Sequence, residues 1–433
     1  MQIAIIGMGY VGLPLALQFA RSGCTVHGLD IDPAKIARLR AGESYIRHIP
    51  GALVAAAVKD GNLRPGADFS VLRNCPAIVI CVPSPLGKNR EPDLSFILNT
   101  GRAIAPHLAR GTLVVLESTS YPGTTDTDLR AVLEADSGLK AGTDFHLAFS
   151  PEREDPGNPA SDVKKIPKLV GGLTPACTAA AVALYRHALD TVVPVADART
   201  AEATKLLENI FRGVNIALVN ELKQVYAAMG IDIWHVIEAA KSKPFGFMPF
   251  YPGPGIGGHC IPVDPFYLTW KAREFGHSTR FIELAGEINE GMPAYVVRRL
   301  GDVLNTQGKP FRGSRIIVVG LAYKPEVDDI RETPSFHLMN LLKAQGSVVD
   351  YFDPYVPVIP PTRENAAWAG TRSVAWSRED FARADAVIIA TAHRGPDYPV
   401  LLDWCPCVID TRNVIRQLQP DLPPARAARL WFA

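Results

Sequence analysis

The segment Gly7-Met8-Gly9-Tyr10-Val11-Gly12 is the strongest indicator of how the N-terminal part of this chain folds. It follows a short β-branched run, residues 2–6, and it precedes residues 13–22, which have a helical pattern. A second apolar run at residues 25–29 ends at Asp30 and completes a strand–helix–strand unit of about thirty residues. The sequence therefore begins with a βαβ unit.

Alternating strands and helices continue beyond this unit, which predicts a parallel sheet. Strands are predicted at residues 77–82 and 113–117, with a helix between them at residues 94–108. A long helical pattern at residues 200–228 predicts a connector helix. The following residues 243–265 are too rich in glycine and proline for a regular element, and such loops are usually functional.

A second alternating unit follows a helical pattern at residues 279–304. Its elements are predicted at residues 315–319, 334–345, 348–352, 386–390 and 407–410. The predicted fold class is α/β, with two Rossmann-like doubly wound domains joined by a central helical domain that contains the connector helix. The predicted domains are residues 1–195, 196–305 and 306–433.

Composition restricts the class of protein. A chain of 433 residues is longer than a single hydrophobic core usually supports, so two or three domains are expected. Its 45 basic and 44 acidic residues nearly cancel, so no overall electrostatic field favours nucleic acid or a membrane surface. Residues 3–20 are apolar, but glycines and Pro14 interrupt them and no basic segment precedes them, so neither an anchor nor a signal peptide is predicted. Seven cysteines without a C-x-x-C pair predict no metal site and a reducing, cytoplasmic setting.

The glycine turn matches the dinucleotide-binding pattern G-x-G-x-x-G in the proper context. Gly7 permits the tight turn, Gly9 lets the backbone approach a pyrophosphate, and Gly12 allows close helix packing. Asp30 lies where a carboxylate would bind ribose hydroxyls and repel a 2′-phosphate, so NAD is predicted in preference to NADP. The alternative is a glycine turn without a ligand.

One cysteine differs from the others by its context. Cys260 lies in the glycine-rich loop 253–265, four residues before Asp264, and a thiolate there could attack an aldehyde. The other six cysteines are expected to be small buried hydrophobic residues. The neighbouring His259 is given no role, because a histidine beside a turn more often makes local hydrogen bonds.

Polar side chains at helical spacing form a second candidate group. Lys205 and Asn209 are four residues apart and Arg212 follows, so all three project from roughly one helix face. The ordinary interpretation is a solvated stripe. The functional interpretation is an ammonium and an amide that stabilise developing oxyanion charge. Residues 117–119 and 150–158 add hydroxyls and carboxylates at loop positions that face the cofactor crevice.

Five segments occur in an order that resembles a known family over essentially the whole chain. They are the glycine turn with Tyr10-Val11, the strand end Cys81-Val82-Pro83-Ser84-Pro85, the helix residues Lys205, Asn209 and Asn220-Glu221, the Gly-Gly-His-Cys loop, and Gly320-Leu321-Ala322-Tyr323-Lys324 with residues 328–334. The chain resembles the UDP-glucose/UDP-N-acetylhexosamine dehydrogenases. The resemblance implies an NAD-dependent oxidation of a UDP-sugar C6 alcohol to a carboxylate. It also implies a dimer formed through the middle domain, with a higher homo-oligomer as the alternative.

The resemblance also implies roles for individual residues. Cys260 would be the nucleophile, Lys205 and Asn209 would stabilise oxyanions, Asp264 and Thr119 would manage a water, and Glu152 would be an acid/base. The implied NAD-binding residues are Gly7, Gly9, Tyr10, Val11, Gly12, Asp30, Lys35, Pro83, Ser84 and Thr119. The implied substrate-binding residues are Glu152, Arg153, Lys205, Asn209, Arg212, Tyr251, Gly253, Gly255, Gly257, Gly258, Lys324 and Arg331, and the last two would clamp the uridine diphosphate.

The resemblance favours one branch of the family. Val263 stands where the glucose-oxidising branch often has lysine, and residues 151–154 replace its Pro-Glu-Phe-Leu. Pro156 lies near the position of that branch's second glutamate. Residues 150–158 and 243–251 resemble the UDP-N-acetylglucosamine 6-dehydrogenases, which serve capsule or O-antigen synthesis. UDP-glucose and UDP-N-acetylmannosamine remain alternatives.

The mechanism follows from chemical need. The C6 alcohol loses a hydride and a proton, Cys260 traps the aldehyde as a thiohemiacetal, and a second hydride transfer leaves a thioester that water hydrolyses. An imine with Lys205 is an open variant of the first step. Three rival classes are disfavoured. A tyrosine-base enzyme using Tyr267 and Lys271 would usually begin with G-x-x-G-x-x-G and have no second nucleotide domain, so these two residues are expected to pack the helix after the loop.

A two-electron hydroxyacid dehydrogenase would need neither Cys260 nor the last third of the chain. A catalytically silent nucleotide-sugar-binding regulator would not need the intact set Cys260, Lys205, Asn209 and Asp264.

Overall fold

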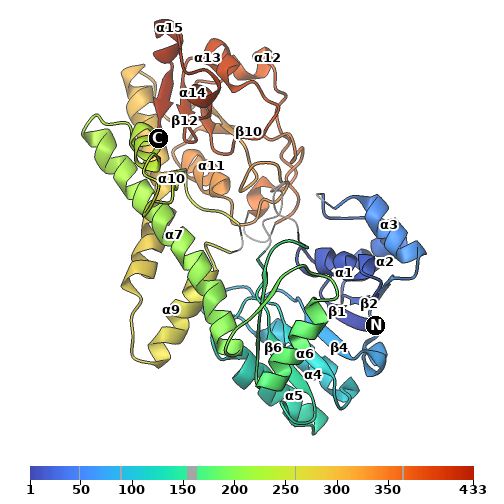
Figure 1. Cartoon of the computed structure of the whole chain (residues 1–433). Coiled ribbons are helices and arrows are strands. Elements are labelled where there is room, and N and C mark those ends of the chain that lie inside the picture. The colour runs from blue at the N-terminus through green and yellow to red at the C-terminus, as the bar shows by residue number, and fades with distance from the viewer. Residues whose placement is uncertain (48, 88–89, 154–162, 259, 363–364) are drawn as a thin grey trace. The chain divides into compact units, whose positions relative to one another are not determined.

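The computed structural model describes the chain except for residues 48, 88–89, 154–162, 259 and 363–364. The described residues form two compact units, Met1–Asn209 with Val263–Thr279, and Ile210–Pro262 with Arg280–Ala433. Helix α7 (Ala198–Ala228) begins in the first unit and ends in the second (Figure 1). The three domains with boundaries after residues 195 and 305 stay a prediction.

The first unit is built on a sheet with the strand order β3-β2-β1-β4-β5-β6-β7-β8. Its first six strands are parallel and have the order of a dinucleotide-binding fold, with the switch point between β1 and β4. β7 pairs antiparallel with β6. The strands are β1 (Gln2–Ile6), β2 (Thr25–Leu29), β3 (Leu63–Gly66), β4 (Ala77–Ile80), β5 (Leu113–Leu116), β6 (His146–Phe149), β7 (Lys168–Gly172) and β8 (Val192–Pro194).

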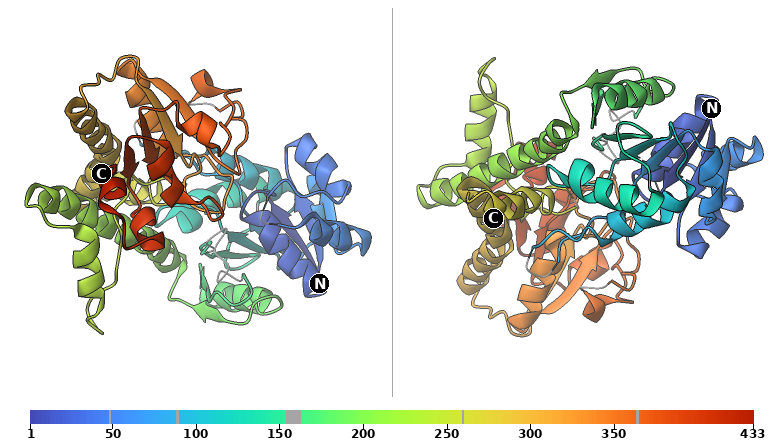
Figure 2. Two further views of the ribbon diagram at one scale, coloured as in Figure 1. Left: turned by 90° about the horizontal axis from the view of Figure 1, so that it is seen from above. Right: turned by 90° about the horizontal axis from the view of Figure 1, so that it is seen from below.

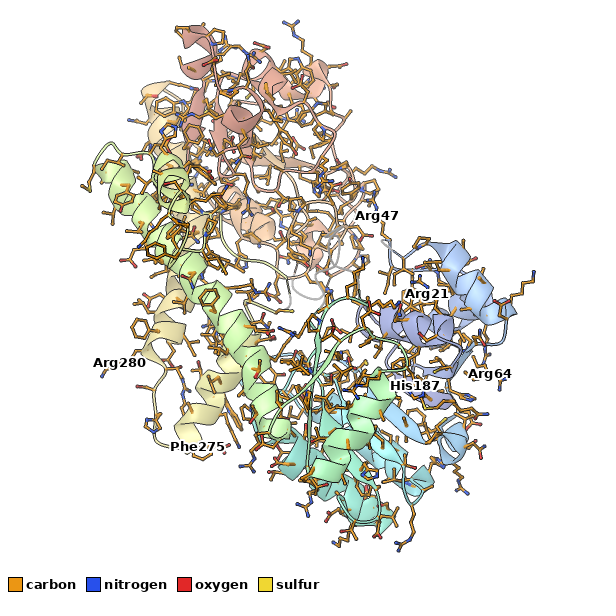
Figure 3. All side chains as sticks on the ribbon, viewed as in Figure 1. Arg21, Arg47, Arg64, His187, Phe275 and Arg280 are labelled. Atoms are coloured by element: carbon orange, nitrogen blue, oxygen red, sulfur yellow. The ribbon has the colours of Figure 1, made fainter. Side chains whose placement is uncertain are left out.

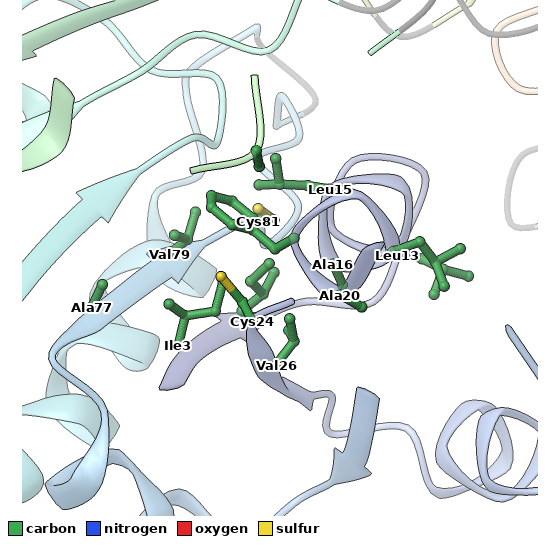
Figure 4. Packing of buried hydrophobic residues seen from close by; sticks show 14 of the residues in the cluster. Ile3, Leu13, Leu15, Ala16, Ala20, Cys24, Val26, Ala77, Val79 and Cys81 are labelled. Atoms are coloured by element: carbon green, nitrogen blue, oxygen red, sulfur yellow. The ribbon is translucent and has the colours of Figure 1, made fainter. Parts of the chain in front are cut away.

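Helices cover both faces of this sheet. Successive side chains of a strand point to opposite faces, so Ile3 and Ile5 join one core with α1 and α6, while Ala4 and Ile6 join another with α4 and α5. Figure 4 shows part of the first core. The helices are α1 (Gly12–Arg21), α2 (Pro33–Arg40), α3 (Gly51–Lys59), η1 (Phe69–Asn74), α4 (Ser95–Ile104), η2 (Ala105–His107), η3 (Thr124–Leu129), α5 (Arg130–Ser137), α6 (Pro175–Tyr185) and α9 (Asp264–Glu274), which ends beside Phe275 (Figure 3).

The second unit contains a smaller sheet with the order β10-β9-β11-β12-β13, and all of its neighbouring strands are parallel. Ile316 and Val318 of β9 pack in a core with α10 and α11, while Ile317 and Val319 point into a core on the other face. This sheet is therefore also covered on both faces. The strands are β9 (Arg315–Val319), β10 (Val348–Phe352), β11 (Ala386–Ile389), β12 (Val408–Asp410) and β13 (Leu430–Phe432).

The helices of the second unit pack around this sheet and around α7. Asn289 of α10 joins Asn220 of α7 through a side-chain hydrogen bond of 2.9 Å. The chain end lies beside α7 (Figure 2), where Lys223 donates a hydrogen bond to the Ala433 backbone. The helices are α8 (Ile233–Lys241), α10 (Arg280–Thr306), α11 (Pro334–Ala344), η4 (Ala366–Trp368), α12 (Arg378–Phe381), η5 (Tyr398–Val400), α13 (Leu401–Trp404), α14 (Val414–Leu418) and α15 (Pro424–Ala427).

The predicted α/β class is confirmed. The strands predicted at residues 25–29, 315–319 and 348–352 have the predicted bounds, and α1, α10 and α11 lie within two residues of theirs. In the segment predicted to be irregular, residues 243–265, the described residues form no regular element until α9 begins at Asp264. Within the described parts of the chain, no helix is both long and apolar enough to cross a membrane.

Candidate active site

The glycine turn after β1 needs glycine at two positions for packing alone. Gly7 has a φ of +94°, and a Cβ atom there would lie 2.5 Å from the Cys81 carbonyl oxygen. A Cβ at Gly12 would lie 1.9 Å from the carbonyl oxygen of Gly7. These two glycines let α1 begin directly above the ends of β1 and β4.

Gly9 differs, because a Cβ added there would meet no atom within 4 Å. Its missing side chain is therefore not explained by internal packing, and it leaves open space over the backbone at the N-terminus of α1. That position is where a pyrophosphate would bind in this fold. The turn thus fits the dinucleotide predicted from the sequence. Tyr10 and Val11 are partly buried against the core of the first unit.

Asp30 lies at the end of β2, as predicted, and it also braces the turn. Its Oδ2 accepts a hydrogen bond of 2.9 Å from the Met8 backbone N–H, and its Oδ1 accepts one of 2.9 Å from the Asp32 backbone N–H. Lys35, predicted as a cofactor residue, lies 3.4 Å from Asp30 Oδ2. The ammonium of Lys35 therefore partners the acid that was predicted to bind ribose.

The loop that carries Pro83 and Ser84 is held from two sides. The Ser118 hydroxyl donates a hydrogen bond of 2.6 Å to the Val82 carbonyl. The Tyr267 hydroxyl, from α9, donates one of 2.8 Å to the Ser84 carbonyl. Burial raises the pKa of Tyr267 well above its ordinary value. Tyr267 is therefore a protonated donor that packs α9 against this loop, which argues against its being a tyrosinate base.

The buried face of α7 carries Glu202, Lys205 and Asn209, which project from successive turns. Asn209 donates a hydrogen bond to the carboxylate of Asp264, the first residue of α9. Both side chains are buried, so this polar contact is shielded from water. Arg212, predicted on the same face, is exposed and belongs to the second unit.

Thr119 is half-buried, and its segment is fixed by its neighbours. The Glu202 carboxylate accepts hydrogen bonds from Ser120 Oγ (3.2 Å), Gly123 N (2.7 Å), and Thr125 N (3.0 Å) and Oγ1 (2.8 Å). Burial raises the pKa of Glu202 to about 7. Glu202 therefore attaches the chain that follows Thr119 to the α7 face that carries Lys205 and Asn209.

Glu152 lies between two lysines. Its backbone carbonyl accepts a hydrogen bond from Lys205 Nζ, and its carboxylate lies 3.9 Å from Lys168 Nζ. Lys168 also donates a 2.7 Å hydrogen bond to the buried Glu117 carboxylate, which accepts another from the Tyr185 hydroxyl. The predicted acid/base group is thus part of a charged network at the end of the first sheet.

Arg153, predicted to contact substrate, is occupied within the first unit. Its guanidinium pairs with Glu208 through contacts of 2.6 and 3.3 Å and donates a hydrogen bond of 2.7 Å to the Pro167 carbonyl. In this arrangement Arg153 positions the chain after β6. The rest of the 150–158 segment, including Pro156, lies outside the described residues from residue 154 on.

Cys260 belongs to the second unit, at the end of the glycine-rich loop. All seven cysteines are described, and Cys260 alone is not buried. The expectation that the other six are buried is confirmed. Partial exposure is a requirement for a thiol that attacks a substrate. His259 lies outside the described residues.

The glycines before Cys260 allow close backbone packing within the second unit. A Cβ at Gly257 would lie 2.7 Å from the Glu332 carbonyl oxygen, and one at Gly258, where φ is +86°, would lie 2.8 Å from the Tyr323 ring. Gly255 also has a positive φ, of +128°. The loop therefore lies against the segment between Gly320 and Pro334.

The start of the loop is anchored by buried amides. The Gly253 N–H donates a hydrogen bond of 3.0 Å to Asn220 Oδ1, and the Asn220 amide donates one to Asn289. A Cβ at Gly253 would lie 2.4 Å from the Arg412 guanidinium. A half-buried arginine thus comes close to the loop, where an anionic ligand would complement its charge.

The predicted uridine diphosphate clamp is partly engaged internally. Arg331 pairs with the Asp329 carboxylate at 2.5 to 3.0 Å, and the Lys324 ammonium lies 5.6 Å from the Tyr323 ring centre. Tyr251, predicted to bind substrate, stacks on Trp234 with ring centres 5.7 Å apart and donates a hydrogen bond of 2.7 Å to Glu238. These contacts leave the binding roles as predictions.

The structure brings Thr119, Glu152, Lys205, Asn209 and Asp264 into the first unit, and Cys260 with its loop into the second. Sequence reasoning missed the residues that hold them. Their signal was weak, because a buried charge is recognised by its partners and those lie far away in the sequence. The missed residues are Lys168, Tyr185, Glu202, Asn289 and Arg412, together with the anchoring role of Asn220.

A glycine turn at the switch point of a parallel sheet, in the same unit as a buried lysine, amide and carboxylate, is typical of a dinucleotide-dependent oxidoreductase. Three domain models of the UDP-glucose/GDP-mannose dehydrogenase family match the chain, the NAD binding domain at residues 1–189, the central domain at residues 199–291 and the UDP binding domain at residues 317–417. The chain belongs to this family and is an NAD-dependent oxidoreductase, as the resemblance implied.

Relatives match over nearly the whole length. UDP-N-acetyl-D-glucosamine 6-dehydrogenase of Pseudomonas aeruginosa is 36% identical over 395 residues, covering 91% of this chain and 90% of the relative. UDP-N-acetyl-D-mannosamine dehydrogenase of Pyrococcus horikoshii is 34% identical over 430 residues, covering 96% of each. A solved structure of UDP-D-ManNAc dehydrogenase from Pyrococcus horikoshii has a TM-score of 0.88 at 32% identity, covering 100% of this chain and 99% of that one.

Proposed function

We propose that this chain oxidises the C6 primary alcohol of a UDP-linked sugar to a carboxylate in two successive steps, through a thioester on Cys260. The observation that carries this proposal is the contrast between Cys260 and the six other, buried cysteines. Cys260 is also joined by only three residues to Asp264, whose carboxylate contacts Asn209. A two-electron dehydrogenase would need no such thiol.

Two oxidations and one hydrolysis would convert the alcohol to the carboxylate. NAD, when bound, accepts one hydride from the C6 carbon in each of the two oxidations. In the first, the alcohol also loses a proton and becomes an aldehyde. The Cys260 thiol then adds to the aldehyde carbon, which gives a thiohemiacetal. The second oxidation also removes the hydroxyl proton of the thiohemiacetal and leaves a thioester. Water then cleaves its C–S bond, which releases the carboxylate and a proton and restores the thiol.

The remaining residues have distinct proposed roles. Lys205 and Asn209 are buried donors, so they would stabilise negative charge on the substrate oxygen. Asp264 and Thr119 would orient the water, and Glu152 would exchange protons with it. An imine between Lys205 and the aldehyde stays an alternative for the first step. The interaction of Lys205 with the Glu152 backbone supports a fixed position for both.

Binding is proposed to divide between the two sheets. The glycine turn with Asp30 and the loop of Pro83 and Ser84 would hold NAD, supported by the open space at Gly9. The glycine-rich loop, Lys324 and Arg331 would hold the UDP-sugar. Of the three predicted domains, residues 1–195 would bind NAD, residues 196–305 would carry the catalytic loop, and residues 306–433 would bind the uridine diphosphate.

The preferred substrate is UDP-N-acetyl-D-glucosamine, in a cytoplasmic pathway to a surface polysaccharide. Support comes from residues 150–158 and 243–251 and from the Pseudomonas aeruginosa relative named for that activity. UDP-N-acetyl-D-mannosamine is the second candidate, because the Pyrococcus horikoshii relative named for it has similar identity. A homodimer is also proposed, since Leu207, Phe211 and Leu218 are exposed on α7.

A stoichiometry assay tests the function. Purified protein is supplied with NAD and, in turn, UDP-N-acetylglucosamine, UDP-N-acetylmannosamine and UDP-glucose, and NADH, aldehyde and acid are measured. Two NADH per acid with no aldehyde in solution is expected. Cys260→Ala should form no acid. One NADH per sugar would favour a two-electron dehydrogenase, and binding without NADH would favour a silent regulator.

A further inference from the structure

Lys168 is buried at the edge of the first sheet where its parallel strands end. Glu117 follows β5, and Glu152 follows β6 by three residues. Because β7 runs opposite to β6, its first residue, Lys168, lies at that same edge. A parallel strand would begin at the opposite edge of the sheet. The reversed strand β7 instead begins at the edge where β5 and β6 end, and so places Lys168 there.

The contacts of Lys168 are unequal. Its Nζ donates a hydrogen bond of 2.7 Å to Glu117 Oε2, and it lies 3.9 Å from Glu152 Oε2. The other Glu117 oxygen accepts a hydrogen bond from Tyr185, so both oxygens of that carboxylate are engaged. Side-chain exposure is 0% for Glu117, 8% for Lys168 and 15% for Glu152. The ammonium thus connects a buried carboxylate to one closer to solvent.

Such a pair is costly as a purely structural element. Removing two charges from water costs several kcal/mol per ion, and a buried ion pair often does no better than apolar side chains of equal volume. Burial lowers the pKa of Lys168, but the carboxylates of Glu117 and Glu152 outweigh this effect and raise it. Lys168 therefore keeps its positive charge in the pH range in which an enzyme works.

We propose that Lys168 is a positioning residue for Glu152, and that Glu117 and Tyr185 fix Lys168 for this task. The ammonium fixes the position of the Glu152 carboxylate, which would accept a proton from the water that cleaves the thioester. This inference rests on the function proposed above. It assigns a role to the reversed strand β7, which supplies the charge.

Other charged or titratable groups of the described residues also face this network. Lys205 binds the backbone carbonyl of Glu152, and Glu208 on the same helix pairs with Arg153. Cys81, at the end of β4, is close enough to influence Lys168 electrostatically. Lys168 Nζ lies 3.9 Å from the Glu152 carboxylate itself, so its removal should displace Glu152 more than the loss of Glu208 or Cys81 would.

The test compares the same change in two backgrounds. Lys168→Met is made in the native chain and in Glu117→Gln, where no buried carboxylate is left without its partner. NADH release is followed with NAD and a UDP-sugar, and is divided into the initial release that precedes thioester hydrolysis and the steady-state rate. Lys168→Met should keep the initial amplitude in either background and lower the steady-state rate at least about tenfold, because a displaced Glu152 no longer activates the water. Lys168→Arg should keep the native rate.

Glu152→Gln is the matched control. It should also show the native initial amplitude and a low steady-state rate, because the group that Lys168 positions is then absent. A native steady-state rate in the folded Glu117→Gln/Lys168→Met variant would overturn the role of Lys168. Absent NADH release in the native protein would instead overturn the proposed function.

Discussion

The Asn209 amide donates a hydrogen bond to the Asp264 carboxylate and so joins α7 to the first turn of α9. The sequence pointed to the two residues separately, one by helical spacing and the other by its distance from Cys260. Both are buried, so the amide orients a carboxylate that has little contact with water. The N-terminal position of Asp264 in α9 adds a favourable interaction with the helix dipole.

Exchanging this pair separates its structural and chemical roles. Asn209→Asp should place two carboxylates within hydrogen-bonding distance and lower the free energy of unfolding by about 1–3 kcal/mol at pH 8. The double variant Asn209→Asp/Asp264→Asn should recover most of that loss, because an amide again donates to a carboxylate. Its kcat should stay at least about 100-fold low, because the oxyanion donor is gone. Thermal unfolding and NADH release measure both; a double variant no more stable than the single one would contradict this view.

Tyr267 should affect cofactor binding more than chemistry. Tyr267→Phe removes the 2.8 Å hydrogen bond to the Ser84 carbonyl but keeps the buried ring. The KM for NAD should rise by about fivefold to tenfold, which corresponds to a lost hydrogen bond of about 1–1.5 kcal/mol, with kcat within about twofold.

Tyr121→Phe is a matched control for this change. Tyr121 belongs to the same aromatic group, with ring centres 6.5 Å apart, but its hydroxyl donates to Asp128 instead of the cofactor loop. Its KM for NAD should stay near the native value. Loss of kcat by several powers of ten in Tyr267→Phe alone would instead support a tyrosine base.

Local patterns predicted the elements around the glycine turns, because strand, turn and helix signals lie within a few residues there. The strand β7 was not predicted, because its sequence ends in Gly171 and Gly172, and paired glycines are typical of loops. A Cβ at Gly171 would lie 2.0 Å from the Asp197 carbonyl oxygen and one at Gly172 would lie 2.3 Å from Thr178 N. These glycines serve tertiary packing, which a local pattern does not record.

The candidate site shows the same division. Lys205, Asn209 and Cys260 could be selected by spacing and by their loop or helix context. Lys168 and Glu202 could not, since an isolated lysine or glutamate is normally exposed and only the folded chain shows that these two are buried. Their roles depend on partners far away in the sequence; Glu202 and Ser120, for example, are 82 positions apart.

Alanine substitutions at Gly7 and at Gly9 should have different effects on stability and on NAD binding. Gly7→Ala forces a side chain into a positive φ and against the Cys81 carbonyl, so it should cost about 2–4 kcal/mol of stability without any ligand. Gly9→Ala meets open space, so the unfolding temperature of the protein alone should stay native while NAD affinity falls at least about tenfold. Differential scanning calorimetry and NAD titration measure these effects. Native NAD affinity in Gly9→Ala would remove the pyrophosphate from this position.

Glu202 should give the protein a recognisable dependence of stability on pH. Burial raises its pKa from an ordinary value near 4.5 to about 7 in the folded chain. A raised acid binds its proton more tightly in the folded state, so its contribution is fully present below about pH 4.5 and is lost as pH rises through 7. The loss amounts to about 3 kcal/mol across that window. Glu202→Gln lacks this titration, so the native chain should lose its stability advantage over the variant between pH 5 and pH 8 in urea unfolding. If the free energy of unfolding changed equally with pH in both proteins, the Glu202 carboxylate would already be ionised at pH 5, stabilised by its four hydrogen-bond donors.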